Sequence, residues 1–270
     1  MAEPFFLVPL YMYPLETAWE PLFEAARIHP EVKFVAIVNP NNGPGPQPLP
    51  DASYLAALRR MHAMPNICPV GYVHCSYGNR PAADVCADMA VYRRWNSHRG
   101  ISLAGIFFDE TPSQLSHLAY MDRLADYAKT TWRREVGKDG MTIYNPGVVV
   151  PRPFFDRPDY VVVFEQSHRH WDETFVSQGL RHAADDVRSK TVAIIHSSQT
   201  DAARVEGLTR YILSFGFRGI YVTDQKDGGY TQWPSSWTEQ AAAVAAESSA
   251  SSPHRFSPGS GARREVELIR

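Results

Sequence analysis

Two segments stand out because in each an acidic residue directly follows a run of large apolar residues. GIFFDE ends in Asp109 and Glu110, and YVVVFE ends in Glu165. A carboxylate beside a buried strand needs a partner or a function, because burying an unpaired charge is costly. Two carboxylates can break a glycosidic bond when one donates a proton and the other acts as nucleophile or base. We therefore expect Asp109 and Glu165 to be catalytic.

The neighbours Asp109 and Glu110 should have different surroundings, because successive strand residues point to opposite sides. Gly105 and Phe107 share a face with Asp109, so we expect Asp109 to reach into the site. Glu110, at the strand's exit, would bind a neighbouring strand end or the substrate. For catalysis, burial must raise the pKa of one carboxyl while hydrogen bonds keep the other ionised.

Polar or ionisable residues also end most of the other apolar runs. We expect them to line the same site, because strand C-termini open on the catalytic face of barrel enzymes. These residues are Asn39, His74, Asn145, His196 and Asp224. For Asn39, Asn145 and Asp224, turn formation is an equally good explanation, since Asn and Asp are common turn residues.

Two loops supply further candidates for substrate binding. The segment NPNNGPGPQP, which contains Asn41, cannot form a helix or strand and either borders a sugar site or is a rigid surface turn. In the segment 71–81, Tyr77 could stack on a sugar face. Arg80 could pair with Asp109 or Glu110, or be solvated.

Other chemistries fit the residue pattern less well. A metal-dependent hydrolase would use His74, His196 and Asp109, but the chain lacks the closely spaced histidine pair of such sites. No nucleophile-elbow glycines surround the serines of HSSQTDAA, and TDQKDGGY lacks a following phosphate-binding helix. We therefore expect neither a metal nor an organic cofactor.

The elements that must position these residues alternate between strands and helices. Near-continuous apolar runs are typical of strands covered on both faces. Strands are predicted at 5–10, 32–39, 67–74, 103–110, 141–145, 160–165, 191–197 and 219–224. Helices are predicted from near Thr17, at 51–62 with Asp51 as N-cap, at 82–98, from Ser113 to 136, and at 201–216 with Gly216 as C-cap.

Eight strands alternating with helices predict an α/β fold, a (β/α)8 TIM barrel in one domain over residues 1–246. A doubly wound open sheet is the alternative. The fifth crossover, PRPFFDRPD, is too proline-rich for a full helix and predicts only a turn. Residues 247–270 are rich in Ser, Pro and Arg and predict a disordered tail.

Composition excludes several classes of partner. With 44% hydrophobic and 21% charged residues, the chain is typical of soluble globular proteins. A net charge of −2 gives no indication of a nucleic-acid or anionic-membrane partner. We expect the protein to be a monomer. No window approaches the ~18 apolar residues of a membrane span. Three cysteines without metal-ligand spacing predict free thiols, with one structural disulfide as the alternative.

Several motifs occur in series between about residues 5 and 240. They are IVNPNNGPG, GYVHCSYGNR, ADMAVYRRW, GIFFDE, YNPG and DYVVVFE. Together they closely resemble the spherulin-4-like, spherulation-specific family of glycoside hydrolases. The resemblance implies a TIM-barrel enzyme that cleaves within alpha-1,4-linked N-acetylgalactosamine or galactosamine polymers such as galactosaminogalactan.

The resemblance also implies roles for the acids. Asp109 would be the nucleophile and Glu165 the general acid/base of a retaining mechanism, with Glu110 as a third acid of the site. A catalytically silent carbohydrate-binding or spore-associated protein on the same barrel is the alternative. Family members are often secreted or surface-bound, whereas MAEPFFLVPLYMYP predicts a first strand rather than a signal peptide, so the compartment stays open.

Overall fold

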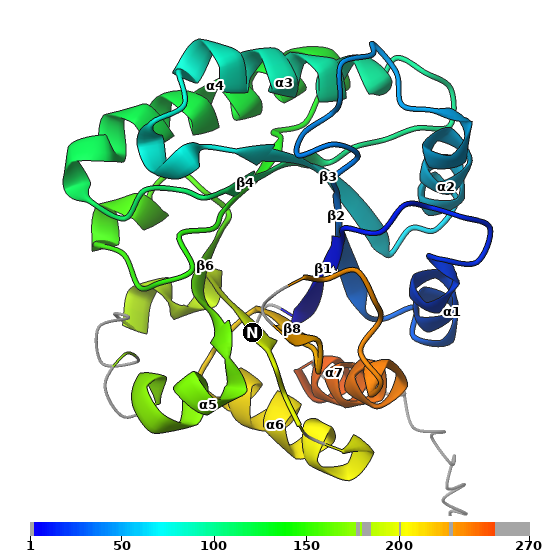
Figure 1. Cartoon of the computed structure of the whole chain (residues 1–270), viewed down its shortest axis with the longest axis vertical. Helices are drawn as coiled ribbons and strands as arrows, with labels where there is room; N and C mark the ends of the chain where they lie inside the picture. The colour runs from blue at the N-terminus through cyan, green and yellow to red at the C-terminus, as the bar shows by residue number, and fades with distance from the viewer. Residues whose placement is uncertain (1–2, 177–178, 180–184, 200, 227–228, 252–270) are drawn as a thin grey trace, which may run out of the picture.

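The protein is a closed barrel of parallel strands, which confirms the predicted (β/α)8 fold and excludes the open sheet (Figure 1). The computed structural model describes residues 3–176, 179, 185–199, 201–226 and 229–251. The strands pair in sequence order, and β8 closes on β1. They are β1 Phe5–Leu10, β2 Lys33–Val38, β3 Ile67–His74, β4 Gly105–Asp109, β5 Met141–Tyr144, β6 Tyr160–Ser167, β7 Thr191–His196 and β8 Gly219–Val222.

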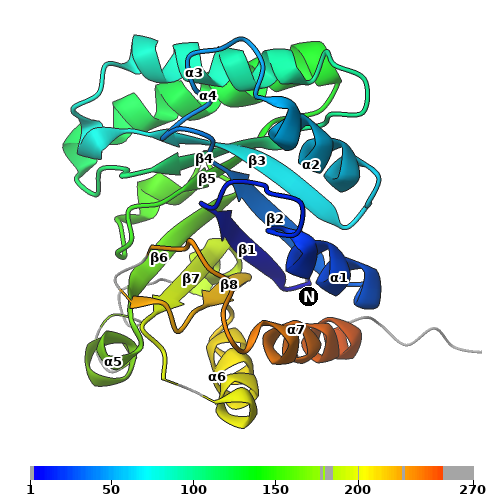
Figure 2. The same ribbon diagram turned by 45° about the vertical axis from the view of Figure 1, so that its right-hand side comes forward.

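The strands are apolar on both faces because side chains fill the barrel and helices cover its outside. All six residues of β1 and all four of β8 are buried. This double burial explains why the sequence shows continuous apolar runs rather than alternation. Figure 2 shows α3 and α4 side by side along one flank of the strands. The helices are α1 Glu20–Ile28, α2 Ala52–His62, α3 Ala82–Trp95, α4 Leu118–Val136, α5 His168–His170, α6 Ala202–Ser214 and α7 Trp237–Ser251.

Local signals set most helix boundaries. Asp51 caps α2 as predicted, because its side chain accepts from the backbone N–H groups of Ser53 and Tyr54. Helix α6 ends at Ser214, and Gly216 follows in the left-handed conformation with φ +89°.

Two predicted helix starts were wrong. Helix α1 begins at Glu20, later than predicted, because Pro21 fits only within the first turn. Ser113 does not cap α4; a 3₁₀ turn at Leu115–His117 comes first, and the helix begins at Leu118.

The crossover between β5 and β6 contains one short 3₁₀ helix, η3 (Arg152–Phe155), as its prolines predicted. Helix α7 was not predicted, and it includes the first five residues of the predicted tail. Residues 252–270 lie outside the described residues. Cys68, Cys75 and Cys86 are free thiols, so the disulfide alternative was wrong.

Gly105 allows β4 to pair closely with β5. A Cβ atom at this position would lie 1.9 Å from the carbonyl oxygen of Met141, its partner in the ladder. Only glycine fits here, and its small size sets the position of the strand that carries Asp109.

None of the helices in the described ranges is long and apolar enough to cross a membrane.

Candidate active site

Three residues from three consecutive strand ends meet at the C-terminal mouth of the barrel. Asp109 is the last residue of β4, Asn145 follows β5, and Glu165 lies near the end of β6. The amide nitrogen of Asn145 donates to Asp109 Oδ1 at 2.7 Å and to Glu165 Oε2 at 2.6 Å. Because these distances share one atom, the two carboxylate oxygens are at most about 5.3 Å apart, the sum of both. The two acids therefore converge in the structure, as predicted.

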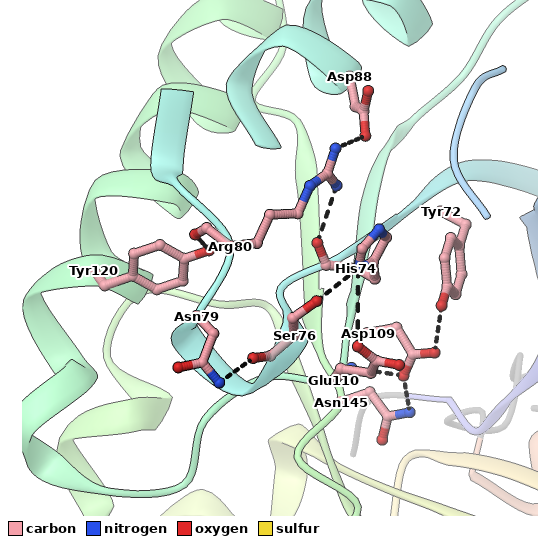
Figure 3. A network of polar contacts seen from close by, with 10 residues as sticks. All are labelled: Tyr72, His74, Ser76, Asn79, Arg80, Asp88, Asp109, Glu110, Tyr120 and Asn145. Carbon is pink, nitrogen blue, oxygen red and sulfur yellow. Dashed lines mark hydrogen bonds and ion pairs between the residues drawn. The ribbon is translucent and has the colours of Figure 1, made fainter. Parts of the chain in front are cut away.

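Asp109 accepts hydrogen bonds on both oxygens (Figure 3). The Tyr72 hydroxyl donates to Oδ2 at 2.8 Å, and the backbone N–H of Glu110 donates to Oδ1 at 2.9 Å. With the Asn145 amide, three donors point at one partly exposed carboxyl group. This is the arrangement that an ionised carboxylate requires, since only lone pairs can accept all three.

Glu165 lies in a different environment from Asp109. Burial raises the pKa of this carboxyl above its ordinary value, and the charge of Asp109 adds to the rise. Hydrogen bonds from the Tyr230 hydroxyl, at 2.7 Å to Oε1, and from Asn145 oppose the rise. The result is an acid that holds its proton more tightly than an ordinary glutamate, beside a carboxylate stabilised by three donors.

A bulge in β6 sets the register just before Glu165. The ladder with β7 shifts between Val162 and Phe164, so Val163 has no counterpart on the neighbouring strand. The backbone N–H of Glu165 then donates to the carbonyl of Gly147 in the β5–β6 connection, at 3.0 Å. Bulges often re-aim a side chain near active sites, and this one precedes the acid.

Three tyrosines form a row against the carboxylates. The Tyr11 ring makes edge contacts with the rings of Tyr72 and Tyr230, at centroid distances of 5.6 and 5.8 Å. Burial and the nearby Asp109 and Glu165 carboxylates raise the pKa of all three tyrosines. Tyr72 and Tyr230 therefore stay protonated and act as donors.

Sequence reasoning missed these tyrosines. Tyr72 could have been found, because it lies two residues before His74 and so shares its face of β3. Tyr11 directly follows β1, at the catalytic end of the barrel. Tyr230 lies in a loop and gives no comparable signal in the sequence.

Glu110 and His74 lie at the rim beside Asp109. Glu110 adopts a left-handed conformation with φ 49°, and its carboxylate lies 3.8 Å from His74 Nδ1. The same ring nitrogen lies 3.0 Å from the Ser76 hydroxyl. Glu110 therefore contacts a neighbouring strand end, as predicted, and its side chain is 39% exposed and open to a ligand.

In the loop between β3 and α3, Tyr77 is exposed to solvent, whereas the Arg80 side chain contacts α3 rather than the acids of the site. The Tyr77 side chain is 63% exposed, and its backbone N–H donates to the carbonyl of Glu110 at 2.7 Å. Arg80 instead pairs with Asp88 at 2.6 Å and donates to the carbonyl of His74 at 3.1 Å (Figure 3). The predicted pairing of Arg80 with Asp109 or Glu110 was wrong, because a partner on α3 is within its reach.

The remaining predicted site residues mostly serve turns. Asn39 accepts from the backbone N–H of Gly43 at 3.0 Å, and Asp224 accepts from that of Ser235 at 3.2 Å. The Asn39 contact is the turn chemistry that the sequence left as an alternative, whereas Asp224 joins the two ends of the loop between β8 and α7. Asn41 is exposed in the same loop as Asn39. His196, the last residue of β7, contacts the hydroxyl of Ser197 at 2.9 Å.

Within the described residues, no three His, Cys, Asp or Glu side chains gather as metal ligands. His74, His196 and Asp109, the ligands of the metal alternative, do not form such a group. The arrangement of Asp109, Asn145 and Glu165 can support acid–base chemistry.

Comparisons with known proteins agree with this fold. The family model described as spherulation-specific family 4 matches residues 6–244. Spherulin-4 from Physarum polycephalum is 31% identical over 247 residues, which cover 88% of this chain and 69% of that protein. The crystal structure of Aspergillus clavatus Sph3 in complex with GalNAc has a TM-score of 0.80 and 28% identity, covering 90% of this chain and 98% of that one. The chain therefore belongs to spherulation-specific family 4.

Proposed function

We propose that this protein is a glycoside hydrolase that cleaves within alpha-1,4-linked N-acetylgalactosamine or galactosamine polymers. The observation that carries the proposal is the pair Asp109 and Glu165, joined through one Asn145 amide. The substrate class is supported by the similarity to Sph3, whose structure contains GalNAc.

The spacing of the two acids supports a retaining mechanism. Retaining glycosidases hold their carboxyl groups ~5–5.5 Å apart, whereas inverting enzymes leave ~6.5–9.5 Å for a water molecule. The bridged oxygens of Asp109 and Glu165 lie within the shorter spacing. Asp109 would attack the anomeric carbon, and Glu165 would protonate the leaving oxygen and later activate water.

The hydrogen bonds of Asp109 indicate which of its oxygens attacks. Oδ1 accepts from both the Asn145 amide and the backbone N–H of Glu110, whereas Oδ2 accepts from the Tyr72 hydroxyl. Asp109 Oδ2 would therefore be the nucleophile, with Tyr72 fixing its direction. Each oxygen of Glu165 accepts one hydrogen bond, from Asn145 or from Tyr230.

The linkage itself excludes attack by the sugar's own acetamido group. In an alpha-linked N-acetylgalactosamine unit the leaving oxygen and the 2-acetamido group lie on the same side of the ring. The acetamido oxygen cannot attack from behind, so substrate-assisted hydrolysis is not open to this linkage. Attack from the opposite face must come from a carboxylate such as Asp109 or from a water molecule that it activates.

Hydrolysis of purified galactosaminogalactan tests the proposal, with mass analysis of the released oligosaccharides. We expect Asp109→Asn and Glu165→Gln each to lower turnover by ~10³-fold or more while the fold is kept. Glu24→Gln is the matched control, because Glu24 is exposed on α1, where it pairs with Arg27. If the wild-type protein binds the polymer but releases no product, the proposal of an enzyme is wrong and the carbohydrate-binding alternative is supported.

A further inference from the structure

The hydroxyl that donates to Glu165 comes from a loop whose backbone is strained. Tyr230 lies between β8 and α7 and has φ 46°, a left-handed conformation that costs a non-glycine residue roughly 1–2 kcal/mol. Such a conformation persists only when surrounding contacts determine it. The contacts that hold Tyr230 therefore decide whether Glu165 keeps its hydrogen bond.

The side chain of Gln225 makes those contacts. Its amide nitrogen donates to the Thr231 hydroxyl at 2.8 Å, and its amide oxygen accepts from the backbone N–H of Thr231 at 2.9 Å. The same oxygen lies 3.4 Å from the backbone nitrogen of Gln232. Gln225 thus holds the two residues that directly follow Tyr230.

Further contacts hold both Gln225 and the backbone next to Tyr230 in place. The backbone N–H of Gln225 donates to the Thr223 hydroxyl at 3.1 Å, and Thr223 is buried directly after β8. On the other side, a Cβ atom at Gly229 would lie 3.0 Å from the Gln225 amide nitrogen. The amide therefore packs against the backbone just before Tyr230 as well as bonding just after it.

We propose that Gln225 is a positioning residue of the acid, which acts through Tyr230 to set how tightly Glu165 holds its proton. The inference rests on the proposed role of Glu165. Its sequence context, TDQKDGGY, belongs to no part of the catalytic motifs, so the loop's role comes from its contacts alone.

The sign of the effect follows from the hydrogen bond. The Tyr230 hydroxyl lowers the pKa of Glu165, because it stabilises the ionised carboxylate. Releasing Tyr230 removes that stabilisation and leaves burial and Asp109, both of which raise the pKa. The titratable groups that face Glu165 are Asp109, Tyr11, Tyr72, Tyr77 and Tyr230.

Titration of Glu165 by carboxyl ¹³C NMR tests the inference without substrate. We expect Tyr230→Phe to raise the pKa of Glu165 by about one to two pH units, the effect of losing one hydrogen bond to a charged group. Gln225→Ala should raise it in the same direction, and the double variant should shift no further than Tyr230→Phe alone. Thr231→Val, which removes the hydroxyl partner, should move the pKa part of the way, and Thr231→Ser should restore it.

Gln232→Ala is the matched control, because its exposed side chain lies in the same loop and only its backbone contacts Gln225. It should leave the titration unchanged. If Gln225→Ala and Thr231→Val both keep the wild-type pKa of Glu165 while Tyr230→Phe shifts it, the positioning role is wrong. Should Gln225→Ala fail to fold, Thr231→Val alone decides.

The same variants give a second measurement where the protein cleaves the polymer. The alkaline limb of kcat/KM reports the pKa of the acid in the free enzyme, so it should move upward with Tyr230→Phe and Gln225→Ala. A wild-type protein without hydrolytic activity would contradict the proposed function, while the NMR titration would still test the positioning role of Gln225.

Discussion

At the scale of single residues, the candidate site consists of two acids in unlike surroundings that one amide joins. Asp109 is surrounded by donors, whereas burial raises the pKa of Glu165. Under the proposed function, this rise suits Glu165 to the role of the acid, because enzymes commonly tune one carboxyl group of a pair by burial. The burial of Glu165 also lowers the stability of the fold at higher pH. Once Glu165 ionises, its charge lies in surroundings that favour the protonated form.

That effect of burial predicts a pH-dependent stability. The folded pKa of Glu165 lies above its ordinary value of 4.5, so its contribution to stability is full below pH 4.5 and is lost as pH rises through the folded pKa. Glu165→Gln, which stays neutral, should remove this loss. Denaturant unfolding should show that the variant gains stability relative to the wild type from pH 4 to 8.

The two proteins are compared by how steeply their free energy of unfolding changes with pH. The absolute values are not compared, because the glutamine also changes the hydrogen bonds to Asn145 and Tyr230 at every pH. A matched variant, Glu24→Gln, replaces an exposed glutamate and should keep the wild-type slope. Parallel curves for Glu165→Gln and wild type would show that burial does not raise the pKa of Glu165.

At the scale of elements, strain is concentrated where β3 and β4 end. Ser76, Tyr77 and Glu110 all have positive φ, at 45°, 54° and 49°. The backbone N–H of Tyr77 donates to the carbonyl of Glu110, and this hydrogen bond joins the two strained turns. The strained pair places the exposed Tyr77 ring and the Glu110 carboxylate at the rim together, and such outliers cluster at functional sites.

Replacing Glu110 with glycine separates strain from chemistry. Glycine adopts positive φ without steric cost, so Glu110→Gly should raise the free energy of unfolding by up to about 1 kcal/mol. The same change removes the carboxylate beside Asp109 and should lower turnover on the polymer. Chemical denaturation and product release measure the two effects.

Glu110→Gln is the companion variant, since it keeps the strained backbone and removes only the charge. Equal losses of turnover in both variants would assign the effect to the carboxylate, and a larger loss in Glu110→Gly would assign it to the backbone. A Glu110→Gly protein less stable than wild type would contradict the interpretation of strain.

At the scale of the whole molecule, the barrel brings acids from β4 and β6 together across β5. Their approach depends on close pairing of β4 with β5, which carries Asn145 at its end. Gly105 permits that pairing at the start of β4. The position of Asp109 beside Glu165 is thus linked to a glycine at the opposite end of β4.

Gly105→Ala should therefore disrupt the barrel. The added methyl would lie 1.9 Å from a backbone oxygen that cannot move without breaking the ladder, so we expect a loss of about 3 kcal/mol or more. Gly207→Ala in α6 is the control, because its Cβ would meet nothing within 4 Å. That helical substitution should stabilise by about 0.5–1 kcal/mol. Equal melting temperatures for the two variants would contradict the close-pairing argument.

The residue pattern alone predicted the barrel and drew attention to Asp109 and Glu165. Strands buried on both faces leave continuous apolar runs, and a parallel barrel sends every strand's C-terminal end to one face, so Asp109 and Glu165 were found without coordinates. The contacts of Asn145 with both acids, of Tyr230 with Glu165 and of Arg80 with Asp88 could be found only in the folded chain. Those contacts depend on a bulge and on loop conformations, which are set by neighbours distant in the sequence rather than by local residue pattern.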